Sequence, residues 1–115
     1  MSQYMVLIYE DPAAYQAGGQ GLVDEVMKGH QDFGNTHGAQ LAGGNALQGI
    51  DTATSLRRGA DGSISISDGP FVETKEAIGG YYVVEARDLD EAIAIASTIP
   101  APGGGLEVRP VMVFD

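Results

Sequence analysis

The chain contains no cysteine, and only six of its 115 residues are lysine or arginine. Because it has no thiol, it can form no disulfide, no thiolate metal site and no cysteine nucleophile, which fits a reducing compartment. Its first apolar run, residues 4–9, is far too short to span a bilayer, and no basic leader or small-residue cleavage site accompanies it. We therefore expect a cytoplasmic protein.

Sixteen acidic residues outnumber the few cations and give a formal net charge of -10. A negative field repels phosphate backbones and anionic lipid surfaces, so we expect neither nucleic acid nor a membrane as a partner. Solubility explains the acidity itself. A chain of this length is expected to form one domain, residues 1–115, and to bury about two-thirds of its unfolded surface.

Hydrophobic periodicity divides the chain into extended and helical segments. Strands are indicated where β-forming residues cluster or alternate, and helices where apolar residues recur every three or four positions. The predicted elements are a strand at 4–9, a helical turn at 13–17, a glycine-rich loop at 18–21, a helix at 22–38, a strand at 41–47 with a bulge at 43–44, hairpin arms at 53–58 and 63–67, a strand at 81–84, a helix from 88 to 99 and a strand at 106–114.

Local signals mark the ends of several of these elements. Asp11 before a proline can cap the first helical turn, and Asp88 with Glu91 forms a capping box for the second helix. Pro110 removes one ladder donor from the last strand and so favours a sheet edge or a bulge there. The inner stripe of the second helix is predicted to contain Leu89, Ala92, Ile93, Ala96 and Ile99.

A hairpin is predicted around residues 59–62, because a four-residue connection with Asp-Gly between alternating segments is a common β-turn. Ile64 and Ile66 share one face of the second arm. Asp68 continues that parity, so its carboxylate is expected on the inner face, where it needs hydrogen bonds, a cation or a wet pocket. The alternative is an Asx-type cap that holds the backbone of residues 69–71.

The order of elements predicts an α+β fold of the ferredoxin-like split βαβ type with an inserted hairpin. Residues 81–84 are apolar at both parities, which suits a central strand covered on both faces or paired within a dimer core. An antiparallel sheet with helices on one face leaves its other face open, and a second subunit is the simplest cover. We therefore predict a homodimer.

His30 falls within the apolar stripe of the first helix. It is either a satisfied core residue or a general base, since its ordinary pKa already lies near neutrality. His37 shares that side, but two histidines are too few for a metal site, and we predict no metal and no cofactor. The glycine-rich segments lack the context of phosphate loops, and no serine has a nucleophile-elbow frame.

A further stretch supplies candidates for ligand contact. Phe71, Glu73 and Lys75 follow Asp68 in a charged connection, and we list them as candidate substrate-binding residues, although such a run is usually only solvated. Phe71 can instead fill the edge of the core, and Lys75 can form an ion pair with Glu73 or with an incoming acid.

The same stretch carries a resemblance to a known family. Several blocks resemble the DGPF family, which belongs to the larger YCII-related (YciI-like) group, and the resemblance covers nearly the whole chain. These blocks are Asp68-Gly69-Pro70-Phe71, Glu73-Thr74-Lys75-Glu76, Gly79-Gly80-Tyr81, residues 4–9, Met27-Lys28-Gly29-His30-Gln31-Asp32-Phe33, Asp88-Leu89-Asp90-Glu91-Ala92 and Glu107-Val108-Arg109-Pro110.

This resemblance implies a dimeric α+β barrel of ferredoxin-like subunits and a pocket lined by a helix histidine and an aspartate after the hairpin, which map onto His30 and Asp68. We hypothesise an enzyme, or an enzyme-like binder of a small organic molecule, in which His30 acts as general base or acid and Asp68 orients it or stabilises its charged form. The expected reaction is a proton transfer, isomerisation or elimination on a small organic acid, for instance an aromatic or lactone-like one. The alternative is a regulatory interaction module with a sigma factor as partner, because some family members occur beside or fused to extracytoplasmic-function sigma factors.

Overall fold

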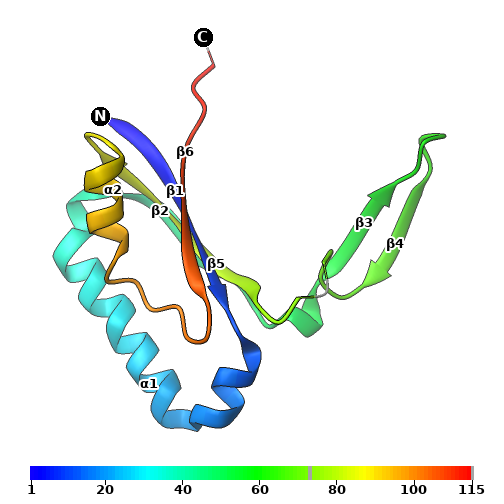
Figure 1. The fold of residues 1–115 in the computed structure, drawn as a ribbon, viewed down its shortest axis with the longest axis horizontal. Coiled ribbons are helices and arrows are strands. Elements are labelled where there is room, and N and C mark those ends of the chain that lie inside the picture. The colour runs from blue at the N-terminus through cyan, green and yellow to red at the C-terminus, as the bar shows by residue number, and fades with distance from the viewer. Residues whose placement is uncertain (73, 115) are drawn as a thin grey trace.

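The computed structural model describes residues 1–72 and 74–114, which form an antiparallel sheet, helices against one of its faces and a separate hairpin (Figure 1). The elements are β1 (Ser2–Glu10), α1 (Pro12–His37), η1 (Gly38–Gln40), β2 (Leu41–Ala46), η2 (Ile50–Thr52), β3 (Thr54–Arg58), β4 (Ile64–Asp68), β5 (Ala77–Ala86), α2 (Leu89–Ala96) and β6 (Gly105–Pro110). The four-stranded sheet has the order β2-β5-β1-β6, and β3 pairs with β4 in a sheet of their own.

The topology is compatible with the predicted ferredoxin-like fold. Without the hairpin, the chain runs β1, α1, β2, β5, α2, β6, with every neighbouring pair in the sheet antiparallel. β5 lies between β2 and β1, so the predicted position of residues 81–84 inside the sheet is confirmed, while only one face of the strand is covered within the described chain. The pairing of β2 with β5 shifts register between Leu41 and Gly43. The irregularity therefore lies at residue 42, one position before the bulge predicted at 43–44.

Alternate residues of the sheet form the core with both helices. Tyr4, Val6 and Ile8 of β1 point to the helical face, while the intervening residues of the strand stay partly exposed on the other face. The core cluster is Tyr4, Val6, Ile8, Phe33, Val84, Ala86, Ala92, Ile95, Ala96 and Ile99. One face of the sheet is therefore covered by helices, and no part of the described chain packs over the other.

Helix α1 begins as the sequence predicts but is longer than expected. The Asp11 carboxylate accepts a hydrogen bond from the Ala13 backbone N–H at 3.0 Å, and a proline occupies the first helical position. Instead of a loop at 18–21, the helix is interrupted only at Gly19, whose φ of 60° is accessible to glycine at little cost. No helix in residues 1–72 and 74–114 is long and apolar enough to cross a membrane.

The second helix and the last strand differ in part from what their sequence patterns predict. Asp88 caps the Glu91 N–H and Glu91 accepts from the Arg87 N–H, so the predicted cap is confirmed. Ile95 is buried, whereas Ile93 is half exposed in a groove beside β6, because α2 lies over the sheet edge. Strand β6 is an edge strand and ends at Pro110 rather than continuing to residue 114.

The predicted hairpin forms, but its expected inner face is not covered within one chain. Its turn is closed by a 2.7 Å hydrogen bond from the Gly59 N–H to the Ser63 carbonyl oxygen. In Figure 1, β3 and β4 stand away from the sheet and helices, and Ile64 and Ile66 remain 49% and 70% exposed. Alternation identified residues that share a face, but this face has nothing to pack against in the single subunit.

Two glycines of α1 offer a matched test of how the helix packs. A Cβ at Gly29 would lie 2.5 Å from Cγ of Pro100, whereas a Cβ at Gly34 would meet no atom within 4 Å. We expect Gly34→Ala to raise the free energy of unfolding by about 0.5–1 kcal/mol, since alanine is the better helix former. Gly29→Ala should lower it by about 1–2 kcal/mol, because overpacking outweighs that gain. Urea denaturation of both variants checks this, and equal effects would contradict the close approach of α1 to Pro100.

Candidate functional site

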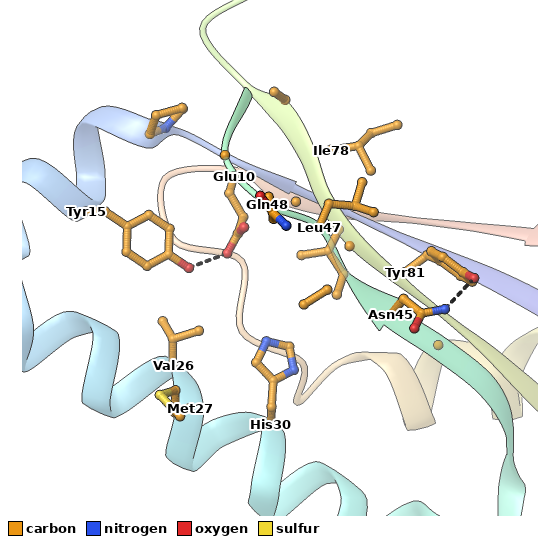
Figure 2. Close-up of a pocket in the computed structure, with 18 of the residues that line it drawn as sticks. Glu10, Tyr15, Val26, Met27, His30, Asn45, Leu47, Gln48, Ile78 and Tyr81 are labelled. Carbon is orange, nitrogen blue, oxygen red and sulfur yellow. Dashed lines mark hydrogen bonds between the residues drawn. The ribbon is translucent and has the colours of Figure 1, made fainter. Parts of the chain in front are cut away.

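A pocket of about 720 Å³ lies between α1 and the facing ends of β1, β2 and β5 (Figure 2). This volume falls in the range of pockets that hold small organic ligands. Most of its wall is apolar and comes from α1, from the segment after β2 and from the start of β5. The apolar wall residues include Val23, Val26, Met27, Leu47, Ile50 and Ile78.

His30 projects from α1 into this pocket, as the helical stripe predicts (Figure 2). Its Nδ1 atom lies 2.7 Å from the hydroxyl oxygen of Tyr82 on β5. The Tyr82 ring in turn packs on Phe33, with 4.7 Å between ring centroids. A Cβ at Gly44 of β2 would lie 2.7 Å from Cδ1 of Tyr82, so the glycine leaves the room that this ring occupies.

The environment favours the neutral form of His30. Burial lowers the pKa of His30 below its ordinary value of 6.5, and the nearby Glu10 carboxylate opposes this shift to a smaller extent. The Tyr82 hydroxyl can donate to Nδ1 or accept from it, so it can hold either tautomer of the imidazole. In both cases Nε2 is the nitrogen that remains available to a ligand.

A second hydrogen-bonded pair lies across the pocket from His30. The Tyr15 hydroxyl donates to Oε2 of Glu10 at 2.5 Å (Figure 2). Burial, and then the hydrogen bond and the charge of Glu10, raise the pKa of Tyr15 above its ordinary value of 10, so the phenol stays protonated and keeps donating. Glu10 ends β1 and Tyr15 lies in the first turns of α1, so the cap at Asp11 sets the geometry of the pair.

The position of Glu10 depends on a bulge in β5. Ile8 pairs with Gly80 and the next residue of β1 pairs with Ile78, so Gly79 has no partner in β1. A Cβ at Gly79 would lie 1.9 Å from Oε1 of Glu10. The carboxylate therefore occupies space that only a glycine leaves open.

The structure of one chain brings His30, but not Asp68, to the pocket. Asp68 ends β4, is exposed and does not line the cavity. Phe71 is 55% exposed and lies under the Arg57 guanidinium, 4.3 Å from its ring centroid. The Lys75 ammonium lies 3.8 Å from Asp11 rather than in the pocket, and Glu73 falls outside the described residues.

Sequence reasoning missed Glu10, Tyr15 and Tyr82 as pocket residues. Glu10 lies just beyond the strand predicted at residues 4–9, and it shares the inward parity of Val6 and Ile8. That parity was the signal that could have placed it. No local pattern pairs Tyr82 with His30, because they are 52 positions apart and meet only through the fold.

The element order and the helix-to-sheet pocket define a small α+β protein with a cavity suited to an organic ligand. The model of the YCII-related domain matches residues 2–115, so the chain belongs to the YCII-related family, as the sequence resemblance indicated. The chain is also similar to an uncharacterized protein of Rhizobium meliloti (strain 1021), with 31% identity over 96% of this chain and 93% of that protein. Neither match names a substrate or a reaction.

Proposed function

We propose that the protein is an enzyme that moves a proton on a small organic molecule, with His30 as the acid or base. The observation that carries this proposal is the neutral imidazole held by Tyr82 inside an apolar pocket. When the Tyr82 hydroxyl accepts a hydrogen bond from the Nδ1–H, Nε2 of neutral His30 carries no proton, so it can take one from a carbon next to a carbonyl group and return it at another position. Such a step is the core of an isomerisation or an elimination.

The second hydrogen-bonded pair of the pocket supports the same chemistry. Tyr15 and Glu10 form a coupled donor and acceptor that faces the same cavity as His30 (Figure 2). A molecule held between the two pairs would therefore meet a base on one side and a hydrogen-bonding couple on the other. The Tyr15–Glu10 pair would orient the molecule by hydrogen bonding, while His30 takes the proton and returns it at another position, as a shift of a double bond requires.

We further propose that the active form is a homodimer arranged as an α+β barrel. Its first support is the uncovered sheet face, which carries Met5, Leu7 and Val83. Its second is the radius of gyration, which is 16.1 Å and exceeds the value of roughly 13 Å typical of a compact chain of about this length, so the single chain is extended and leaves surface for a partner. In this proposal Asp68 acts on a histidine of another subunit, since within one chain it lies outside the pocket. A sigma factor as partner stays a prediction, without a structural observation in its favour.

Deuterium exchange into 2-tetralone tests the proposed proton transfer without knowledge of the natural substrate. In D₂O the wild type should exchange the protons next to the carbonyl group faster than buffer, as followed by proton NMR. His30→Gln should lower the enzymatic rate by about a hundredfold or more, the usual contribution of general acid–base catalysis. Because the basic form is needed, the rate should fall as pH drops through the pKa of His30, which lies below 6.5.

His37→Gln is the matched control, because it changes the other histidine of the same helix, which stacks on Phe33 and does not line the pocket. It should exchange at the wild-type rate. Equal rates for the wild type and His30→Gln would overturn the assignment of His30. Asp68→Asn tests, in the same assay, whether Asp68 of one subunit assists the histidine of another. An exchange rate equal to that of the wild type would show that Asp68 is not part of the site.

A further inference from the structure

The charge of the pocket is concentrated on one side chain. Among the described residues that line the cavity, Glu10 is the acidic one, and none is a lysine or an arginine. Burial keeps His30 neutral, so it does not offset the carboxylate. The rest of the chain adds to this field, since its formal net charge is -10.

The Glu10 carboxylate is fixed but not saturated. Tyr15 donates to Oε2, and no other hydrogen bond to the Glu10 carboxylate is present among residues 1–72 and 74–114. A carboxylate offers about four acceptor positions, so acceptor capacity is left for a ligand. Because Gly79 has no side chain, it leaves open the space that the other oxygen, Oε1, occupies. The acceptor is therefore built into the wall of the cavity rather than carried on a mobile surface side chain.

The remainder of the cavity suits a hydrocarbon framework. Val26 and Met27 of α1 face Leu47 and Ile78 across the pocket (Figure 2). Apolar area removed from water would supply most of the binding free energy, and the few polar groups would set orientation. A carboxylate on the ligand would meet a like charge without a cation to compensate, whereas an ammonium group would form a charge-assisted hydrogen bond.

We propose that this pocket selects a compact apolar molecule that carries a protonated amine, which binds the Glu10 carboxylate, and that it rejects carboxylates of the same shape. The proposal rests on the proposed function, because it names the substrate class of the same site. Tyr15 and Gly79 are positioning residues in it, since they act on the ligand through Glu10. The ring of such a ligand would lie between Val26 and Ile78, within reach of Nε2 of His30.

Two ligands with one ring system test the proposal: 2-aminotetralin, which is cationic at pH 7.5, and tetralin-2-carboxylate, which is anionic. Isothermal titration of the full chain should give at least about tenfold tighter binding of the amine, as expected for one charge-assisted hydrogen bond. Glu10→Gln should remove this preference. Gly79→Ala should reduce it as well, because the added Cβ displaces the carboxylate while the fold stays intact.

Glu85→Gln is the matched control, since it removes the same charge from an exposed position of β5 outside the pocket. It should keep the full preference for the amine. A preference that survives in Glu10→Gln but weakens in Glu85→Gln would show that the general acidic field selects the ligand, and would overturn the proposal. Equal binding of the two ligands by the wild type would also overturn it.

The His30→Gln variant separates this inference from the proposed function. It should bind the amine as tightly as the wild type, because Glu10 carries the recognition, while its exchange of 2-tetralone is lost. Amine selectivity without exchange in the wild type would refute the proton-transfer function and leave the ligand class standing. Exchange without amine selectivity would refute the ligand class alone.

Discussion

Phe33→Ala is expected to lower the free energy of unfolding by about 3–5 kcal/mol, the usual cost of truncating a buried aromatic side chain. Phe33 is 2% exposed and is the largest of the fully buried side chains. Its ring packs on Tyr82 and His37, so its loss opens a cavity that the sheet cannot close by collapse. Since domains of this size are typically stable by about 5–15 kcal/mol, the variant should lose a large share of its stability.

Chemical denaturation followed by circular dichroism measures this effect, and Phe71→Ala provides the control with the same substitution. Phe71 is exposed on the hairpin segment and contacts Arg57, an exposed cation–π contact worth about 0.5–1 kcal/mol. The control should therefore change stability by no more than that. A large loss for Phe71→Ala would show that a second copy of the chain buries the hairpin segment, as the proposed homodimer allows, although Phe71 is exposed within one chain.

Gly104→Ala is expected to destabilise the protein by about 3 kcal/mol or more, at the upper end of overpacking effects. A Cβ at Gly104 would lie 2.0 Å from the Tyr9 carbonyl oxygen and 3.0 Å from the Glu10 backbone nitrogen. These are backbone atoms at the end of β1, so no side-chain rotation can relieve the collision. The strand end must move, and the Glu10 carboxylate must move with it.

Gly105→Ala is the matched control for this substitution, because a Cβ at the next position would meet no atom within 4 Å. Its free energy of unfolding should stay within about 0.5 kcal/mol of the wild type, as for most surface changes. Urea denaturation of the two variants side by side gives the comparison. Similar midpoints for both would contradict the close approach of Gly104 to the end of β1.

The parts of the fold that follow local rules could be predicted from the sequence. The hairpin turn, the caps at Asp11 and Asp88, and the edge position set by Pro110 each depend on residues within a few positions of one another. All of them occur in the structure. Periodicity also placed His30 on the inward side of its helix, which is why it reaches the pocket.

The parts that depend on distant segments could not be predicted in this way. Alternation grouped Ile64, Ile66 and Asp68 on one face, but it carries no information about what that face packs against. In α2 the predicted stripe included Leu89 and Ile93, which are about half exposed in the groove at the sheet edge, and omitted Ile95, which is buried in the core. The contact of His30 with Tyr82 requires the register of β2, β5 and α1 together, which no single stretch encodes.

The way the hairpin is attached has a consequence for how such a protein can diversify. Ala46 pairs with Gly80, and the Leu47 N–H donates to the Gly79 carbonyl oxygen at 2.9 Å, so the chain leaves β2 directly beside β5. A short connection could replace residues 48–76 without disturbing the four-stranded sheet, and a longer one is tolerated because closure entropy grows slowly with length. The segment also supplies Gln48 to Ile50 to the pocket wall. Changes in its length or composition can therefore alter ligand preference across generations while the sheet and its core remain as they are.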